Sequence, residues 1–541
     1  MSIILKEKCD IYRDDVIGIC IPKGIMQAAY QSALAYLGIP FFPLDYDYSN
    51  EMMKEVVMKS KIKYVLLDFK KKRDYDQELK DKIVFVDLEL NESEDLIQCI
   101  NKSNHFSRVD IAMLIATSGS TGIPKITTLN WDGIMNCIVS SIDIFGITSN
   151  DIAFNITNYS HDMGIFDILG MTYLGGTTIV PNQENYKDPS VWVELLTKYN
   201  VTLWISVPAF LEMLLLNKQF DLENAIKNIK TILLGGDYVR TSLIENIWKL
   251  NPCSKIFSVG GPTETTMWNI YHEVNSKDID NGFIPYGVPI YNTEYHILDS
   301  NMDICPLGKE GVMFISGIGV VNGYVGGENK EKFIDYNGKK YYDSGDYGEY
   351  LPTGEILFVG RKDRQIKVNG ERIELDGIEN RLNLLKGIKK AVLIYNNNKI
   401  KVFYTVFDSA SKENIEKILK EKLSDYMFPY ILHNIEEFPL NRAGKVDRLL
   451  LSEFSINNSK KKKRNFSETE EILLEIFKEV FLEEIDINQD FYSLGGDSVI
   501  AMRIIALINQ KLGVKLTPYD IFENLTIIDL AIYLDSIRGE N

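Results

Sequence analysis

The apolar run at residues 111–116 is the feature that most constrains the fold, because it ends abruptly at a polar segment that contains glycine. A run of this length and composition predicts a buried strand followed by a turn. The backbone of such a turn can approach an anion closely, and hydroxyl, amide and ammonium groups can bind phosphate oxygens. The segment therefore predicts a phosphate-binding loop, with an ordinary turn between strands as the alternative. Its candidate ligands are Thr117, Ser118, Gly119, Ser120, Thr121, Gly122 and Lys125.

This loop differs from the P-loop of the mononucleotide ATPases. That motif places glycine before its lysine and a hydroxyl residue after it. Here Pro124 precedes Lys125 and Ile126 follows it. The loop is therefore predicted to hold phosphate within another fold.

Strand-like and helical segments alternate on both sides of the loop. Residues 16–21 and 63–67 are apolar and strand-like, and residues 25–37 have a helical pattern between them. Two further apolar runs, residues 202–207 and 231–234, predict more buried strands. This alternation predicts an α/β fold with parallel strands.

Polar residues follow the predicted strands at the positions where open α/β sheets bind ligands. Gly235 and Gly236 end one strand, and the segment with Thr263 and Glu264 ends the next. A single carboxylate among hydroxyls suits a hydrated Mg²⁺ on a nucleotide, because Mg²⁺ prefers oxygen ligands and keeps several waters. The alternative is a polar turn before a helix.

The chain of 541 residues is long enough for three to four domains. We expect a large α/β core at residues 1–362 that ends in a β subdomain, and a small, mobile α+β subdomain at 363–455. Residues 456–466 are polar and charged, which predicts a linker. Residues 467–541 show the periodicity of a four-helix domain and carry 15 acidic and 5 basic residues.

Within the helical domain, Ser498 follows two glycines and an aspartate and stands at the start of a predicted helix, residues 499–512. A serine at the positive end of a helix is well placed to hold a phosphate ester. An ordinary N-cap is the alternative.

Composition excludes several classes of protein. The net charge of −17 disfavours nucleic acid as a partner. No run of about 18 apolar residues predicts a membrane span, and the apolar stretch near the start is too short for a signal peptide, so we expect a cytoplasmic protein. Six scattered cysteines predict neither a disulfide framework nor a zinc site.

Taken in order, these segments resemble the adenylation domain of nonribosomal peptide synthetases followed by a peptidyl carrier protein, within the adenylate-forming enzymes. The phosphate loop and residues 261–266, 342–346, 360–365 and 441–445 resemble the core motifs of that family, and residues 494–498 resemble the attachment site of the carrier. The resemblance spans nearly the whole chain.

The resemblance implies an ATP-dependent ligase. An amino acid carboxylate would attack the α-phosphorus of Mg-ATP, and the aminoacyl-AMP would load the chain's own carrier as a thioester on 4′-phosphopantetheine. The product would serve nonribosomal peptide or related natural-product biosynthesis.

The resemblance also implies roles for particular residues. Lys445 would be the catalytic cation, and Lys367 would replace it during thioester formation after rotation about a hinge at Asp363. Ser498 would carry phosphopantetheine. ATP would contact the phosphate loop together with Gly236, Thr263, Glu264, Asp346, Arg361 and Lys445, with Glu264 as the Mg²⁺ ligand.

By the same resemblance, Asp162 would pair with the α-ammonium of the substrate. The implied pocket consists of Asp162, Met163, Phe166, Ser206, Leu233, Gly235, Val259, Met267 and Trp268. Two large aromatic side chains would leave a small apolar cavity, so we expect glycine, alanine, cysteine or serine as substrate.

The chain departs from the family in three respects. Few residues precede Thr117, so the N-terminal elements look shortened, and a small helper protein is a possible partner. Gly260 stands where the family often has an aromatic residue against adenine, which predicts weaker stacking. Residues 159–164 resemble a segment of fatty acyl-AMP ligases.

Two other functions therefore stay open: a ligase that loads a fatty or other carboxylic acid on the carrier, and a scaffold without catalysis. The expected partners are an amino acid substrate, a phosphopantetheinyl transferase and a downstream condensation or tailoring enzyme.

Overall fold

The first sheet is built around β1 (Ile17–Cys20), whose four residues are all buried. Strands β2 (Phe41–Pro43) and β3 (Tyr64–Asp68) pair with it in parallel. The sheet has the order β4-β3-β1-β2-β5-β6, completed by β4 (Ile83–Val86), β5 (Ile111–Thr117) and β6 (Lys125–Asn130). All pairs are parallel except β5 with β6, which are antiparallel. The predicted strands at residues 16–21, 63–67 and 111–116 are confirmed.

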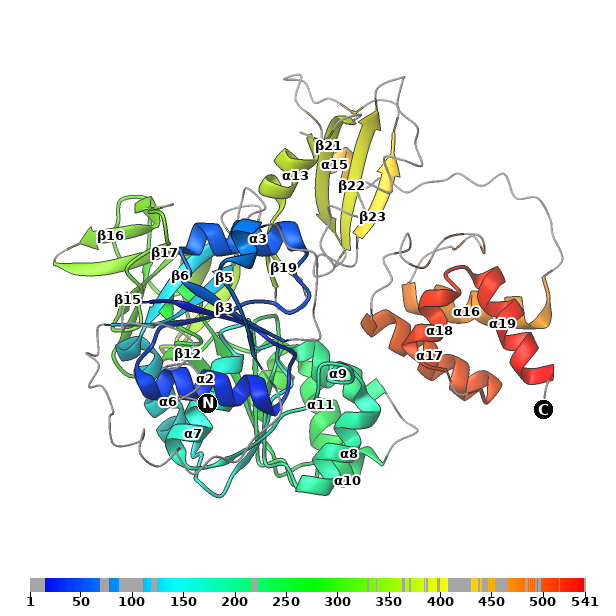
Figure 1. Ribbon diagram of the computed structural model, residues 1–541, viewed down its shortest axis with the longest axis horizontal. Coiled ribbons are helices and arrows are strands. Elements are labelled where there is room, and N and C mark those ends of the chain that lie inside the picture. The colour runs from blue at the N-terminus through cyan, green and yellow to red at the C-terminus, as the bar shows by residue number, and fades with distance from the viewer. Residues whose placement is uncertain are drawn as a thin grey trace. The chain divides into compact units, whose positions relative to one another are not determined.

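The computed structural model describes residues 15–68, 77–86, 110–117, 124–216, 221–327, 330–336, 338–361, 365–368, 371–383, 385, 388–396, 399–406, 430–435, 438–439, 446, 448–452, 466–481, 485, 487, 489, 491, 494, 498–514 and 516–539. The chain divides into two units. The first comprises residues 1–119, 123–211 and 220–363, and the second comprises the remaining residues (Figure 1).

The second sheet of the first unit has seven strands in the order β13-β12-β11-β10-β9-β7-β8. Strands β7 to β11 are parallel, and β12 and β13 are added antiparallel. The strands are β7 (Ile152–Phe154), β8 (Thr177–Ile179), β9 (Leu203–Ser206), β10 (Thr231–Gly235), β11 (Lys255–Gly260), β12 (Ile270–Glu273) and β13 (Val288–Pro289).

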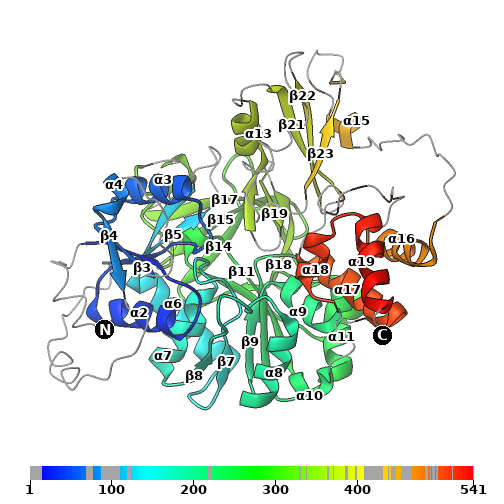
Figure 2. The ribbon, with the colours of Figure 1, turned by 45° about the vertical axis from the view of Figure 1, so that its right-hand side comes forward.

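Helices cover both faces of this second sheet. Figure 2 shows α8, α10 and α11 on one side of β9 and β11, and α2 and α6 on the other. The helices of the unit are α2 (Ile25–Leu37), α3 (Asn50–Ser60), α4 (Gln77–Lys80), α6 (Trp131–Phe145), α7 (Met171–Leu174), α8 (Pro189–Tyr199), α9 (Pro208–Leu216), α10 (Leu222–Ile226), α11 (Thr241–Leu250) and α12 (Ser276–Asn281). A π-helix, η1 (Phe166–Gly170), and 3₁₀ turns η2 (Thr263–Thr265) and η3 (Lys330–Lys332) complete it.

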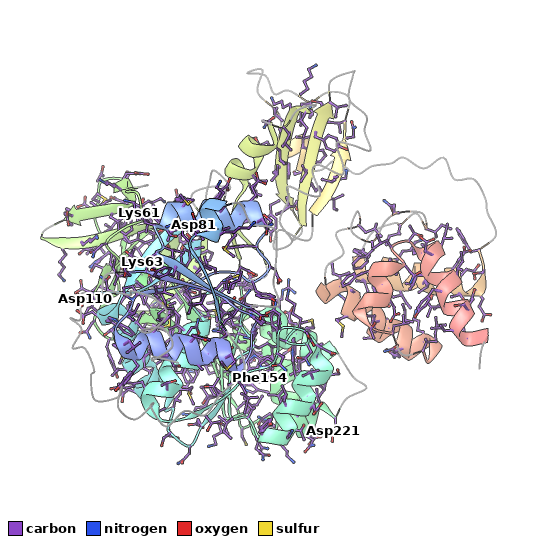
Figure 3. All side chains as sticks on the ribbon, in the orientation of Figure 1. Lys61, Lys63, Asp81, Asp110, Phe154 and Asp221 are labelled. Atoms are coloured by element: carbon purple, nitrogen blue, oxygen red, sulfur yellow. The ribbon has the colours of Figure 1, made fainter. Side chains whose placement is uncertain are left out.

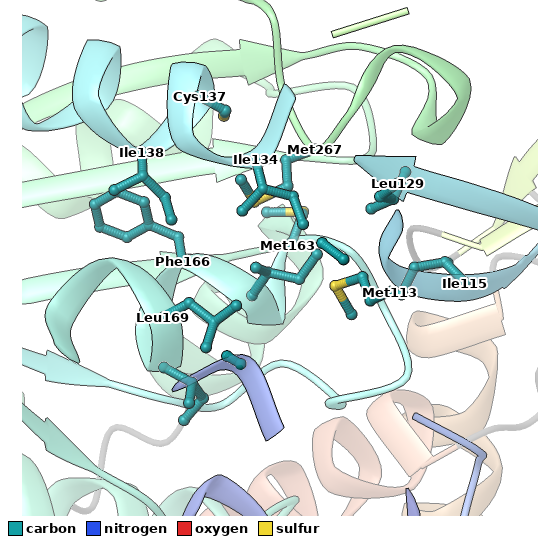
Figure 4. Close-up of a cluster of buried hydrophobic side chains, with 14 of the residues drawn as sticks. Met113, Ile115, Leu129, Ile134, Cys137, Ile138, Met163, Phe166, Leu169 and Met267 are labelled. Atoms are coloured by element: carbon teal, nitrogen blue, oxygen red, sulfur yellow. The ribbon is translucent and has the colours of Figure 1, made fainter. Parts of the chain in front are cut away.

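One hydrophobic cluster joins the two sheets. It contains Met113 and Ile115 of β5, Phe166 of η1, and inward-facing residues of β9, β10 and β11, together with the buried faces of α2 and α6. Figure 4 shows part of this cluster, with side chains of β5, β6, α6 and η1 packed together. Side chains fill the spaces between the layers, where Phe154 is fully buried, whereas Lys61 and Asp221 are exposed (Figure 3).

A third, antiparallel sheet confirms the predicted β subdomain. Its order is β14-β15-β17-β16, with β18 paired to β17. The strands are β14 (Thr293–Leu298), β15 (Gly311–Gly317), β16 (Phe333–Tyr336), β17 (Lys339–Tyr350) and β18 (Ile356–Arg361).

The second unit contains a small α+β part and a helical part. The first has the hairpin β19 (Gln365–Val368) and β20 (Glu371–Glu374), and a sheet of β21 (Ile388–Asn396), β22 (Lys399–Val406) and β23 (Tyr430–Asn434). Helices α13 (Leu375–Asn383) and α15 (Arg448–Ser452) pack on β21.

The helical part consists of four helices in the described residues: α16 (Glu468–Phe481), α17 (Ser498–Leu512), α18 (Pro518–Glu523) and α19 (Ile527–Gly539). Helix α16 begins with a capping box. The Ser467 amide donates to the Glu470 carboxylate at 2.9 Å, and the Glu470 amide donates to the Ser467 hydroxyl at 3.1 Å. None of the helices in the described part of the chain is long and apolar enough to span a membrane.

Candidate active site

The two ends of the predicted phosphate loop lie side by side. Thr117 is the last residue of β5 and pairs with Lys125, the first residue of β6. The Thr117 hydroxyl donates to the Lys125 carbonyl at 3.4 Å, and the Lys125 side chain is buried. The remaining predicted ligands, Ser118, Gly119, Ser120, Thr121 and Gly122, lie outside the described residues. A strand hairpin therefore fixes both ends of this loop.

Glu264 lies in a buried polar cluster beside the hairpin. It stands in η2 and is 1% exposed, and its carboxylate accepts a hydrogen bond from the Tyr324 hydroxyl. The Lys125 ammonium lies 5.9 Å from the centre of the Tyr324 ring. Tyr324 thus links two predicted nucleotide-binding residues, and sequence analysis missed it because it lies 60 positions from Glu264.

One carboxylate with hydroxyl neighbours fits Mg²⁺ on a nucleotide, since Mg²⁺ takes one or two carboxylates and fills its other positions with phosphate oxygens and water. Glu264 has this character, with Thr263 and Thr265 next to it in η2. No group of three or more His, Cys, Asp or Glu side chains within the described residues could hold a metal without a nucleotide.

Asp346 and Arg361 form a second polar pair. They face each other across the antiparallel strands β17 and β18. The Arg361 guanidinium donates to the Asp346 carboxylate and, at 3.3 Å, to the Ser344 carbonyl. The Asp346 amide in turn donates to the Ser344 hydroxyl at 3.0 Å. Adjacent strands therefore preorganise the two side chains predicted to contact ribose.

The space beside Gly260 is occupied by an aromatic ring from elsewhere in the chain. A Cβ added to Gly260 would lie 2.1 Å from Cε2 of Tyr286. The Tyr286 ring also contacts Phe358 edge to face, with centroids 5.8 Å apart. Burial raises the pKa of Tyr286, and the nearby Asp346 carboxylate adds to this effect. The aromatic group that Gly260 lacks is therefore supplied at the same place by Tyr286.

The predicted substrate pocket centres on Asp162. Burial raises the pKa of its carboxyl group, while hydrogen bonds from the Thr263 hydroxyl and the Met163 amide act in the opposite direction. The Phe166 and Trp268 rings, both fully buried, lie with centroids 5.6 Å apart. Thr263 therefore joins the pocket to the cluster around Glu264.

The other predicted pocket residues fall into two groups. Met163, Leu233, Val259 and Met267 belong to the same buried cluster as Phe166 and Trp268. Gly235 allows β10 to approach β11, because a Cβ there would lie 2.7 Å from the Val259 carbonyl. The structure thus brings these residues together within one core cluster.

Ser206 is differently placed. Its hydroxyl accepts a hydrogen bond from the Trp204 indole at 2.7 Å and donates to the Val207 carbonyl at 2.8 Å. Trp204 packs against Trp192 of α8, on the face of β9 opposite Leu203 and Ile205. Gly236 directly follows β10 with a positive φ of 80°, a conformation that favours glycine.

The predicted hinge, the two catalytic lysines and the carrier serine lie near or within the second unit. Asp363 and Lys445 lie outside the described residues. Lys367 lies in β19, and Ser498 is the first residue of α17. The predicted helix start at residue 499 is thus correct to one position.

A family model of AMP-binding enzymes matches residues 3–325, more than half of the chain. The chain belongs to the AMP-binding enzyme family. A second model, that of the phosphopantetheine attachment site, matches residues 471–534. Together they establish an adenylate-forming domain followed by a carrier domain, the arrangement of nonribosomal peptide synthetases.

Several relatives of this AMP-binding enzyme are synthetases. It is 31% identical to bacitracin synthase 1 of Bacillus licheniformis over 97% of its own length and 10% of that protein. It is 28% identical to the anguibactin system regulator of Vibrio anguillarum over 97% of its own length and 51% of that protein. The chain therefore spans between a tenth and a half of these relatives.

Solved structures show the same fold. One is a nonribosomal peptide synthetase protein containing adenylation and PCP domains bound to a vinylsulfonamide inhibitor, with a TM-score of 0.82 and 21% identity over 99% of this chain and 90% of that one. Another is the Vibrio cholerae adenylation domain AlmE in complex with glycyl-adenosine-5′-phosphate, with a TM-score of 0.70 and 20% identity over 84% and 90%. The predicted fold class is thereby confirmed.

Proposed function

We propose that this enzyme activates a small amino acid with ATP and loads it on its own carrier domain. The observation that carries the proposal is the position of Asp162, which bonds to Thr263 beside Glu264 and lies in the segment that also supplies Phe166, a buried ring packed against Trp268. A substrate held there would have its ammonium group at Asp162 and its carboxylate directed to the nucleotide cluster.

The environment of Asp162 favours an amine over a fatty acid. Burial raises the pKa of this carboxyl, and the charge of Glu264 adds to the effect. A substrate ammonium would compensate this cost, because an opposite charge stabilises a buried carboxylate. An alkyl chain would add no opposite charge to that of the nearby His161.

Phe166 and Trp268 favour a small side chain. Both are fully buried and already in contact with each other. Met163 and Met267 add further apolar volume to the same cluster. Glycine, alanine, cysteine or serine fit such a pocket better than a large residue.

For the nucleotide, we assign ribose to Asp346 and Arg361, adenine to the Tyr286 ring, and the phosphates to Lys125 and the loop before it. Mg²⁺, held by Glu264 and the phosphates, would supply positive charge to the reacting phosphoryl group. The carboxylate oxygen of the substrate attacks the α-phosphorus, the bond to the bridging oxygen breaks, and pyrophosphate leaves. Lys445 would stabilise the charge that develops.

The second half-reaction passes the acyl group to the carrier and releases AMP. Phosphopantetheine on Ser498 would provide the accepting thiol. Rotation at Asp363 would bring Lys367 in place of Lys445. A phosphopantetheinyl transferase, a downstream condensation or tailoring enzyme and a small helper protein are the proposed partners, and the cytoplasm is the proposed location.

Intact-mass analysis tests the proposal. The protein is first modified by a phosphopantetheinyl transferase and then incubated with ATP, Mg²⁺ and mixed amino acids, beside a Ser498→Ala control. We expect a mass gain equal to one small amino acyl group that is absent from the control. Loading by fatty acids alone would replace the proposal by that of an acyl ligase, and loading by neither would contradict both.

A further inference from the structure

The backbone that leads into Trp268 is strained. Thr266 has φ of 71° and Met267 has φ of 52°. Positive φ is uncommon for residues other than glycine and is an outlier for a β-branched residue such as threonine. Such conformations are energetically costly and persist only where surrounding contacts enforce them. The contacts that enforce this conformation are therefore candidates for a functional role.

The Thr266 hydroxyl donates to the Gly319 carbonyl at 2.8 Å, and helix α6 makes further contacts at three levels. At its first turn, Gly133 approaches so closely that an added Cβ would lie 2.7 Å from the Thr266 hydroxyl. One turn later, the Cys137 thiol donates to the Trp268 carbonyl at 3.1 Å. One further turn on, the Ser141 hydroxyl accepts a hydrogen bond from the Trp268 indole nitrogen at 2.9 Å.

These three residues share one face of α6, since they are spaced four apart along the helix. Figure 4 shows α6 carrying Ile134, Cys137 and Ile138 alongside Met267 and Phe166. Cys137 and Ser141 also bond to each other, and the Asp162 charge acts on the Cys137 thiol, whose pKa is raised to about 12, chiefly by burial. Helix α6 therefore contacts the Trp268 indole through Ser141, and its Cys137 thiol lies within the electrostatic influence of the Asp162 carboxylate.

Among these contacts, the hydrogen bond between the Trp268 indole and the Ser141 hydroxyl restricts the orientation of the ring most. Trp268 is 1% exposed and Ser141 is fully buried, so no water replaces this bond from bulk solvent. An indole N–H left without an acceptor in such a place costs free energy. The ring would rotate towards another acceptor, and the pocket would change shape.

We propose that Ser141 and Cys137 are positioning residues that set the size selectivity of the substrate pocket. They clamp the strained Thr266–Trp268 segment to α6 and so hold the indole ring against Phe166. The clamp keeps the pocket closed to larger side chains. This inference rests on the proposed function, because it takes Trp268 as a wall of the substrate pocket.

Substrate-dependent pyrophosphate exchange tests the clamp in the full-length protein. The ratio of kcat/KM for the preferred small amino acid to that for valine or leucine is measured for Ser141→Ala, Cys137→Ala and Ser141→Thr. Ser140→Ala is the matched control, because Ser140 is the adjacent residue of the same helix and is also buried. Thermal unfolding of each variant reports on folding.

We expect the ratio to fall about tenfold in Ser141→Ala, the size expected for one unsatisfied buried donor. The fall should be smaller in Cys137→Ala and absent in Ser140→Ala, and the KM for ATP should stay unchanged. Ser141→Thr, which keeps the acceptor, should retain more selectivity than Ser141→Ala. An unchanged ratio in a folded Ser141→Ala protein would overturn the clamp while the proposed function stood.

Failure of the proposed function gives a different result. The wild-type protein would then exchange pyrophosphate with fatty acids and with no amino acid. The same ratio would be measured over a series of chain lengths. The clamp then predicts that Ser141→Ala shifts the preferred chain length of the fatty acid. An unshifted chain-length preference would overturn the clamp as well.

Discussion

Asp162 and Asp167 lie close together in the chain but in contrasting surroundings. Asp167 is fully buried, and one of its oxygens accepts from the Asn155 amide at 3.1 Å. Lys23 lies near it and bonds through its ammonium to the Asn155 side chain at 2.5 Å and to the Thr157 carbonyl at 2.7 Å. All the charge and hydrogen bonding around Asp167 therefore comes from residues that also hold the core together.

The region of Asp162, five positions earlier, is of another kind. Asp162 is partly exposed and takes its hydrogen bonds from neutral donors, the Thr263 hydroxyl and the Met163 amide. Burial raises the pKa of both carboxyls. The difference is that the fold supplies a buried lysine to Asp167, whereas Asp162 has the partly exposed His161 as its cationic neighbour and would receive a further cation from an incoming substrate. A raised carboxyl pKa thus accompanies a core contact in one region and, as we propose, substrate binding in the other.

The largest expected effect comes from Asp162→Asn. We expect kcat/KM for the amino acid to fall at least about a hundredfold, because loss of one partner of a buried charged pair costs about 2–5 kcal/mol. The free energy of unfolding of the unliganded protein should stay the same or rise, since the raised pKa shows that folding disfavours the charged form. Pyrophosphate exchange and denaturant unfolding measure the two. Full activity in the variant would contradict the proposed pairing with an ammonium.

Sequence analysis predicted local features of these regions well. The helical pattern of residues 25–37 predicted the bounds of α2, and the glycines and aspartate before Ser498 predicted the start of α17 to one position, because both depend on local sequence. The polar ends of β10 and β11 were predicted to lie where open α/β sheets bind ligands.

Contacts between distant segments escaped prediction. The Tyr286 ring occupies the place beside Gly260, and Tyr324 reaches Glu264. Ser141 of α6 holds Trp268 from 127 positions away. Each contact depends on how separate elements pack, and no periodicity or motif in one segment encodes its partner. The missing side chain at Gly260 was the one signal in the sequence. It predicted weaker stacking on adenine, because the sequence does not show that Tyr286 lies beside Gly260.

The second-largest expected effect concerns the region of Asp167 and should leave binding of the amino acid unchanged. Lys23→Met keeps most of the side-chain volume but removes the donor that bonds to Asn155 and Thr157. Two buried acceptors without a donor cost about 2–4 kcal/mol of unfolding free energy. Denaturant unfolding near pH 7 gives this quantity. KM for the amino acid, measured well below the unfolding transition, should match wild type, and a selective rise in KM would show that the two regions are coupled.

The smallest effect is a change in pH dependence from Asp167→Asn. Burial, as the main cause, raises the pKa of Asp167 from its ordinary value of 3.8 to about 8. Between those values the folded protein keeps a proton that the unfolded chain releases, so this group contributes stability at low pH and loses it as the pH rises through about 8. Lys23 acts in the other direction and at higher pH, because burial lowers its pKa from 10.5 to about 7.

Unfolding free energies at pH 5 and pH 7.5 separate these contributions. Relative to Asp167→Asn, the wild-type protein should lose about 1–2 kcal/mol between the two pH values, less than the full linkage slope because Lys23 begins to lose its proton in the same range and offsets part of the change. Asp162→Asn serves as the matched variant. Burial also raises the pKa of the Asp162 carboxyl, but Asp162 is partly exposed. Parallel profiles for wild type and Asp167→Asn would show that Asp167 stays ionised in the fold as one half of an ion pair with Lys23, and the contrast between the two regions would then rest on charge pairing alone.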